Sequence, residues 1–362
     1  MSVTRDAASE TLAAWSERVR AAAASGRPLR PVGGGTKDFY GRELVGEPFP
    51  TGGYEGIVDY DPTEMVITAR CGTPLEVVER ALAGAGQMLA FEPPRFGERS
   101  TLGGCVASGL SGPRRPWGGA LRDALLGVRL LDGRGEDLVF GGRVMKNVAG
   151  FDVSRLIAGS LGTLGIVLEA SLRVLPLPKT ERTRVLELPP DAAIRRINEW
   201  GARPLPISAT WHADGLLCVR LSGSENAVAA AARDIGGAAL DGAPAFWSAV
   251  RDQTHAFFGG DRAAALWRLS VQSTAPHAGF PGDQAIEWGG AQRWLRPRGE
   301  SSAEEWRAWA RRHGGHATLY RGDKSLGVFQ PLDPATLAIH RALKATFDPA
   351  GILSRGRMFE GL

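Results

Sequence analysis

The sequence is poor in the residues that build metal clusters and disulfide frameworks. Its 362 residues include three cysteines, Cys71, Cys105 and Cys218, and no C-x-x-C pair. An odd number of widely spaced cysteines argues against an iron–sulfur cluster, a zinc site or a disulfide scaffold. We therefore expect reduced, buried thiols of a cytoplasmic protein, and no metal site in this chain.

Long apolar runs and clusters of positive charge are also missing. No stretch approaches the roughly 20 apolar residues that cross a bilayer. Residues 7–24 mix apolar positions at helical spacing with Glu and Arg, which is unlike a signal peptide. The net charge is only +4, from 43 basic and 39 acidic residues, which disfavours nucleic-acid binding. We expect a soluble protein, or one held at a membrane only through a partner.

Glycine, in contrast, is abundant, with 48 residues, and it gathers in three segments of the first half. These segments are Pro31–Lys37, Thr101–Gly109 and Gly159–Ile166. Without Cβ atoms, the backbone can approach a ligand closely and point successive amide groups into one concavity. The three segments therefore indicate a backbone wrapped around an extended dinucleotide. Neither a G-x-G-x-x-G fingerprint nor a P-loop is present, which disfavours Rossmann and P-loop proteins.

The first half has the pattern of an α+β domain. We predict a helix over 7–24, a strand over 29–32, a helix with Thr73 as its N-cap, and a hairpin that turns at residues 132–135. A long strand over 164–175 ends at two prolines, and the prolines mark a domain boundary.

The second half has a different pattern. Strands and helices over 184–235 follow the order β-α-β-β-α, which fits a ferredoxin-like sheet. More strands are expected at 266–272, 284–288, 292–296 and 316–321, with a helix over 303–312. A last helix should begin at Asp333 and Pro334. The predicted domains are 1–178, 179–332, and a C-terminal helix and tail over 333–362.

The glycine segments, together with Lys146–Asp152, resemble the FAD-binding domain of the vanillyl-alcohol-oxidase/p-cresol-methylhydroxylase (PCMH) type. Later segments resemble the smaller FAD-binding subunit of bacterial glycolate oxidase, essentially end to end; these are Gly112–Gly118, Leu266–Ser270, Gly289–Leu295, Gly314–Thr318 and Phe347–Gly351. The resemblance implies an α+β fold in which a two-part PCMH-type FAD-binding domain precedes a ferredoxin-like α+β cap. The C-terminal helix would return to the FAD domain.

The predicted cofactor-binding residues come from the glycine segments and, by resemblance, from the chain around them. They are Pro31, Gly33, Gly34, Gly35, Thr36, Lys37, Pro93, Thr101, Leu102, Gly103, Gly104, Ala107, Ser108, Gly109, Arg115, Gly118, Asp123, Gly162, Gly165 and Ile166. By resemblance, the first two segments hold the pyrophosphate, Pro93 lies near the flavin end, and Ile166 supplies main-chain contacts. For Arg115 a solvated turn, and for Asp123 a capping role, are the competing interpretations.

We predict that the FAD is held without a covalent bond. The first glycine segment has no histidine, and Cys105 has small, apolar neighbours that would not activate a thiol. Catalytic residues stay open. Arg268 and Arg293, each beside a tryptophan, could bind a substrate carboxylate or could serve packing alone. His313 and His316 are the only close histidine pair, and they lack an acidic companion.

The resemblance implies an FAD-binding subunit of a complex that oxidises glycolate or a related 2-hydroxy acid. Its partners would be a larger FAD-containing subunit and an iron–sulfur subunit, and it would be cytoplasmic or peripheral at the inner membrane through them. Two alternatives remain: a self-sufficient FAD-dependent oxidoreductase of a small hydroxy acid or alcohol, and a non-catalytic interaction subunit.

Overall fold

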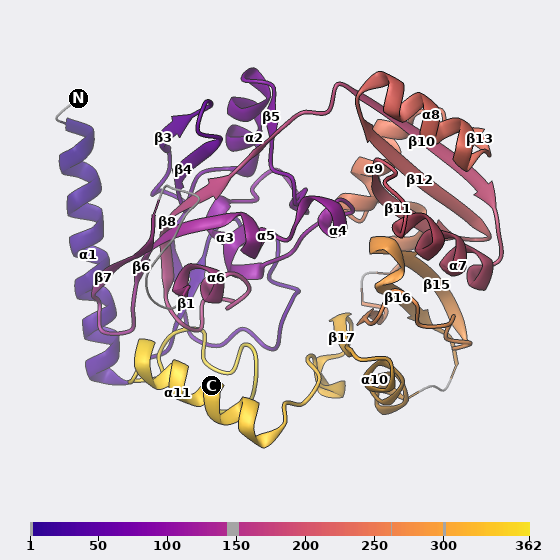
Figure 1. Cartoon of the computed structure of the whole chain (residues 1–362). Helices are drawn as coiled ribbons and strands as arrows, with labels where there is room; N and C mark the ends of the chain where they lie inside the picture. Colours follow the sequence, from indigo (N-terminus) through magenta and orange to yellow (C-terminus); the bar gives the residue numbers. More distant parts are fainter. Residues whose placement is uncertain (1–2, 143–151, 262, 300–301) are drawn as a thin grey trace.

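The computed structural model describes residues 3–142, 152–261, 263–299 and 302–362. Two β-sheets form its two halves, and the last helix, α11, runs beneath the first half (Figure 1). The Lys146–Asp152 motif falls mostly outside the described residues.

A five-stranded antiparallel sheet forms the centre of the first half, in the order β3-β4-β8-β6-β7. Two small pairs stand apart from it: the parallel pair β1-β2 and the antiparallel pair β5-β9. The strands are β1 (Leu29–Val32), β2 (Glu47–Pro50), β3 (Ile57–Asp61), β4 (Val66–Arg70), β5 (Gln87–Met88), β6 (Leu125–Leu131), β7 (Asp137–Gly141), β8 (Ile166–Arg173) and β9 (Leu175–Pro176). The helices are α1 (Val3–Ser25), α2 (Leu75–Gly84), α3 (Leu102–Ser108), α4 (Arg115–Gly118), α5 (Leu121–Ala124) and α6 (Val153–Ile157).

An eight-stranded sheet spans the second half, in the order β13-β10-β12-β11-β15-β16-β14-β17. The predicted β-α-β-β-α unit is present, but it does not end as a separate sheet. The pairing of Trp211 with Glu287 and of His212 with Ile286 joins β11 to β15 and continues the sheet. The strands are β10 (Thr180–Glu187), β11 (Ile207–Ala213), β12 (Leu216–Gly223), β13 (Ala238–Ala239), β14 (Leu266–Ser270), β15 (Gly282–Glu287), β16 (Gln292–Pro297) and β17 (His316–Arg321). The helices are α7 (Pro190–Gly201), α8 (Glu225–Ile235), α9 (Ala243–Arg251) and α10 (Ala303–Arg312), with short 3₁₀ turns η1 (Ala256–Phe258), η2 (Trp288–Gly290) and η3 (Lys324–Leu326).

The predicted start of α2 is wrong by one capping residue. Pro74, not Thr73, occupies the N-cap position, and no side chain caps this helix. The Thr73 hydroxyl instead accepts a hydrogen bond from the Gly56 amide at 2.9 Å, because the 51–56 loop crosses this position. The Thr73 hydroxyl therefore binds the Gly56 amide, which is distant in the sequence, instead of capping α2.

The end of the chain completes the first half. Helix α11 (Pro334–Phe347) begins with the Asp333 cap that the sequence predicts. The tail then runs beside β1, where Leu29 and Leu353 form a parallel bridge. Ile352 and Leu353 are fully buried in the same apolar core as the first sheet. Within the described chain, no helix is both long and apolar enough to cross a membrane.

Candidate functional site

The first glycine segment packs closely against the start of the second and against the residues just before it. A Cβ added at Gly34 would lie 1.5 Å from the carbonyl oxygen of Arg99, and one at Gly33 would lie 2.3 Å from the Thr101 hydroxyl oxygen. Such separations are far below van der Waals contact, so side chains other than hydrogen are excluded at both positions. The segments that the sequence predicts to act together are in fact adjacent.

The second segment forms the start of α3. The Thr101 hydroxyl caps this helix by accepting from the Gly104 amide at 3.3 Å, and Gly109 ends it with φ of 62°. Leu102 is buried in the core, and Gly103 packs so closely on Cys71 that a Cβ would lie 2.7 Å from the Cys71 Cβ. Leu102 and Gly103 therefore fix α3 against the core of the first half.

The third segment docks on α3. The Gly159 amide donates to the Val106 carbonyl at 3.0 Å, and the Leu161 amide donates to the Ala107 carbonyl at 2.8 Å. Gly162, with φ of 74°, brings this turn close to Pro31 of the first segment. Farther along, the chain enters the core: Ile166 begins β8 and is 1% exposed, and Gly165 packs against Leu130.

One cavity lies where the three segments meet; we call it the clasp cavity. Its walls are Arg30, Pro31, Val32, Gly33, Gly34, Gly35, Thr36, Lys37, Asp38, Leu44, Val45, Thr101, Gly104, Ala107, Ser108, Leu161, Ser354 and Arg357. Ten of the predicted cofactor-binding residues are in this set. Arg30 and Asp38, which directly flank the glycine segment, are not among the predicted cofactor-binding residues, and neither are Ser354 and Arg357 of the C-terminal tail.

The clasp cavity carries an excess of positive charge. Three cations line it, Arg30, Lys37 and Arg357, against the single carboxylate of Asp38. The Lys37 ammonium donates to the Ser100 hydroxyl at 2.6 Å, and burial lowers the pKa of Lys37. Burial also lowers the pKa of Arg357 to about 10, and its guanidinium donates to the Asp38 carbonyl at 2.8 Å. Backbone amides beside cations suit a diphosphate.

The other ten predicted residues do not line this cavity, and four of them, Pro93, Arg115, Gly118 and Asp123, belong to none of the three glycine segments. Pro93 is buried in the loop before α3. Arg115 stacks over the Trp288 ring, with its guanidinium carbon 4.4 Å from the ring centroid. Gly118 allows close approach to the Ala90 carbonyl, and the Asp123 carboxylate accepts from the Ala120 amide at 2.9 Å, a capping contact.

Cys105 lies on α3, is fully buried and does not line the clasp cavity. Burial raises the pKa of its thiol to about 12, so the thiol stays protonated at neutral pH. A protonated, enclosed thiol is a poor nucleophile.

Among the described residues, no group of three or more His, Cys, Asp or Glu side chains is arranged to hold a metal ion. His313 instead packs against Trp309, with the two ring centroids 4.6 Å apart.

A larger cavity of about 840 Å³, which we call the junction cavity, adjoins the clasp cavity at Thr36. Both halves of the chain line it, with Phe39 and Phe96 on one side and Gln253 and Arg321 on the other. Phe96 and Gln253 both have φ of 55°, a strained value for residues with side chains. The size and the mixed apolar and polar walls fit a planar ring system.

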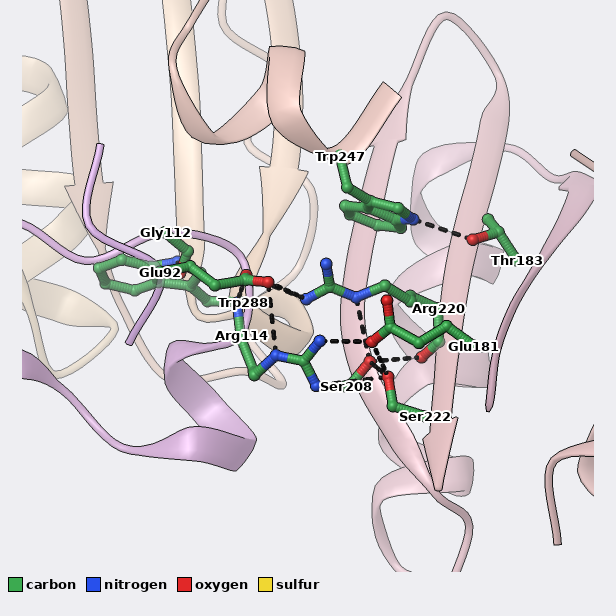
Figure 2. A network of polar contacts seen from close by, with 10 residues as sticks. All are labelled: Glu92, Gly112, Arg114, Glu181, Thr183, Ser208, Arg220, Ser222, Trp247 and Trp288. Atoms are coloured by element: carbon green, nitrogen blue, oxygen red, sulfur yellow. Dashed lines mark hydrogen bonds and ion pairs between the residues drawn. The ribbon is translucent and has the colours of Figure 1, made fainter. Parts of the chain in front are cut away.

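A network of charged side chains joins the two halves of the chain (Figure 2). The Glu92 carboxylate accepts from the Arg114 amide at 2.9 Å and from the Arg220 guanidinium of β12 at 2.9 Å. Arg114 also pairs with Glu181 of β10. Because residues 92 and 114 precede and follow the second glycine segment, this network fixes both ends of that segment to the second sheet.

We expect Glu92→Gln to lower the free energy of unfolding by about 3 kcal/mol, because it leaves Arg114 and Arg220 with one carboxylate fewer in a buried site. Urea denaturation measures the change. Glu199→Gln is the matched control, since its partner Arg196 and Glu199 itself are exposed and the loss should stay below about 1 kcal/mol. Equal losses in the two variants would contradict the interpretation.

Comparisons with known proteins agree with this geometry. Residues 7–141 match a family model described as an FAD binding domain. The chain is 46% identical to the glycolate oxidase subunit GlcE of Escherichia coli (strain K12), over 96% of this chain and 97% of that protein. It is 32% identical to the glycolate oxidase subunit GlcD of Bacillus subtilis (strain 168), over 43% of this chain and 33% of that protein. A solved structure of alkyldihydroxyacetonephosphate synthase matches with a TM-score of 0.61 at 16% identity, covering 94% of this chain and 73% of that one, which shows a shared fold.

Proposed function

The chain belongs to the family of the glycolate oxidase subunit GlcE, and from that membership we propose that it is the FAD-binding subunit of a complex that oxidises glycolate or a related 2-hydroxy acid. The FAD is held without a covalent bond. The complex includes a larger FAD-containing subunit and an iron–sulfur subunit that receives the electrons. Within this chain, residues 1–178 and 333–362 would bind the cofactor, and residues 179–332 would form a cap.

The convergence of three glycine segments on one positively charged cavity carries the proposal. Backbone amides of Gly33–Thr36, with Arg30 and Lys37, would hold the diphosphate. The junction cavity beyond Thr36 would hold the ring system. Bound FAD would supply the acceptor for a hydride from the substrate. The protein would bind the FAD and orient it.

The first test is flavin content. The purified full chain should show yellow absorbance, or gain it on addition of FAD, at one FAD per chain. Acid precipitation should release all of this flavin into the supernatant, because the Cys105 thiol is protonated and enclosed. A colourless chain that added FAD does not change would refute the function, and flavin that precipitates with the protein would refute non-covalent binding.

The second test concerns partners. A tagged chain purified from its native cell should carry a second flavoprotein and an iron–sulfur protein, with more than one flavin and several iron atoms per complex. Recovery of the chain alone with one flavin and no iron would instead support a self-sufficient oxidoreductase.

A further inference from the structure

The loop at residues 92–97, which precedes α3, supplies part of the wall of the junction cavity through Arg95, Phe96 and Gly97. Two of its residues have left-handed backbone: Glu92, with φ of 46°, and Phe96, with φ of 55°. This conformation is costly for residues with a Cβ atom, so it persists only where surrounding contacts hold it. The contacts of this loop therefore determine the shape of the cavity.

Residues of the first half hold the loop from one side. The Arg95 guanidinium forms an ion pair with Glu79 of α2. The Phe96 ring packs against Phe39, with the ring centroids 5.1 Å apart, and the Lys37 ammonium lies 5.8 Å from the centroid of the Phe96 ring. Because Lys37 also lines the clasp cavity, Phe96 connects the walls of the two cavities.

A carboxylate of the second half holds the loop from the other side. Asp252, the residue after α9, accepts a hydrogen bond from the Arg95 amide at 2.9 Å. It also accepts from the Arg251 guanidinium at 2.6 Å, and both of these side chains are largely buried. Hydrogen bonds to an ionised acceptor are stronger than those between neutral groups. The backbone of the loop is thus joined to residues 179–332, the cap.

The residues that follow the two partners of this hydrogen bond line the same cavity. Phe96 comes directly after Arg95, and Gln253 comes directly after Asp252. Both Phe96 and Gln253 have φ of 55°. The hydrogen bond therefore joins the two halves one residue before each strained position, and its loss would let the cavity wall relax.

We propose that Asp252 is a positioning residue for bound FAD: its hydrogen bond to the Arg95 amide sets the Phe96 wall of the junction cavity, and so couples FAD binding to packing of the cap against the first half. The proposal rests on the proposed function, in which this cavity holds the flavin ring system. Coupling of this kind is reciprocal, so bound FAD should also strengthen the contact between the halves.

Titration of the flavin-free full chain with FAD, followed by flavin fluorescence, measures the affinity. Asp252→Ala should weaken FAD binding about tenfold or more, because it removes the acceptor of a charge-assisted hydrogen bond. Asp252→Asn keeps a side-chain oxygen and should stay within about threefold of wild type. The control is Asp234→Ala in α8, whose exposed pair with Arg203 should not affect the affinity. Equal FAD affinity in wild type and Asp252→Ala would overturn the proposal.

A double-variant cycle distinguishes positioning from direct contact, because Asp252 itself lines the cavity. Phe96→Ala removes the wall and should also weaken FAD binding. If Asp252 acts through Phe96, the chain with both substitutions should bind FAD about as weakly as Phe96→Ala alone. Additive losses would instead mean that the carboxylate contacts the cofactor by itself, and they would overturn the positioning role. If Asp252→Ala does not fold, Asp252→Ser replaces it in each test.

Hydrogen exchange gives a readout that needs no bound flavin. In the flavin-free chain, the peptide with the Arg95 amide should exchange faster in Asp252→Ala than in wild type, and Asp234→Ala should leave it unchanged. In wild type, added FAD should slow exchange both at residues 92–97 and at residues 250–254 of the cap. Exchange at Arg95 that Asp252→Ala does not alter would contradict the proposal.

The same measurements separate this inference from the function on which it depends. If the wild-type chain does not bind FAD, the proposed function fails. If wild type binds FAD and Asp252→Ala binds it equally well, the role of Asp252 fails and the FAD assignment stands.

Discussion

A chain with Gly34→Ala is expected to lose its bound FAD. The added methyl carbon would sit 1.5 Å from the Arg99 carbonyl oxygen, so the first glycine segment and the loop that leads into the second must move apart. Backbone cannot yield as a flexible side chain can, and the separation would open the clasp cavity at the place where, in the proposed function, both segments bind the diphosphate. Flavin absorbance per chain after gel filtration measures the loss.

The control for this variant is Gly53→Ala. Nothing lies within 4 Å of a Cβ at Gly53, so the same chemical change should leave flavin content and melting temperature unaltered. Gly34→Ala should also lower the free energy of unfolding by about 1 to 3 kcal/mol through overpacking. Full FAD occupancy in Gly34→Ala would show that the two segments do not form the cofactor site.

The second large effect is expected from Lys344→Met. The Lys344 ammonium of α11 is buried, lies 2.7 Å from the Asp348 carboxylate, and donates to the carbonyls of Thr163 and Leu353 at 2.8 and 2.6 Å. Methionine has a similar length but leaves Asp348 as an uncompensated buried charge. We expect a loss of about 3 to 5 kcal/mol in the free energy of unfolding, measured by urea denaturation.

A double variant separates charge from packing. Lys344→Met with Asp348→Asn removes both charges, and it should recover part of the loss, since the cost arises from the unpaired carboxylate. No recovery in the double variant would mean that the hydrogen bonds to the Thr163 and Leu353 carbonyls dominate. The exposed pair Arg196 and Glu199 again offers a control with little effect.

Local signals explain what could be predicted from the sequence. Strand β1 has the predicted bounds, and the Asp333–Pro334 start of α11 is confirmed, because strand patterning and helix caps depend on neighbours a few residues away. The glycine segments can be recognised for the same reason. Positions such as Gly33 and Gly34, where a Cβ atom would clash, are visible in the sequence as glycines.

Long-range pairings explain what could not be predicted. Arg357 reaches the clasp cavity from more than 300 residues away, through a tail whose position depends on the bridge between Leu29 and Leu353. The two residue pairs that join β11 to β15 carry no sequence signal of their own. The role of Glu92 likewise depends on its hydrogen bond from Arg220, which lies on a strand distant in the sequence.

The bridge between Leu29 and Leu353 also bears on how the protein is made. Strand β1 leads directly into the first glycine segment, and one of its edges is covered by Ile352 and Leu353, which follow α11. We expect this edge of β1 to stay uncovered until Leu353 has been synthesised. A truncated chain that ends before Leu353 should therefore bind less FAD, which flavin absorbance per chain measures.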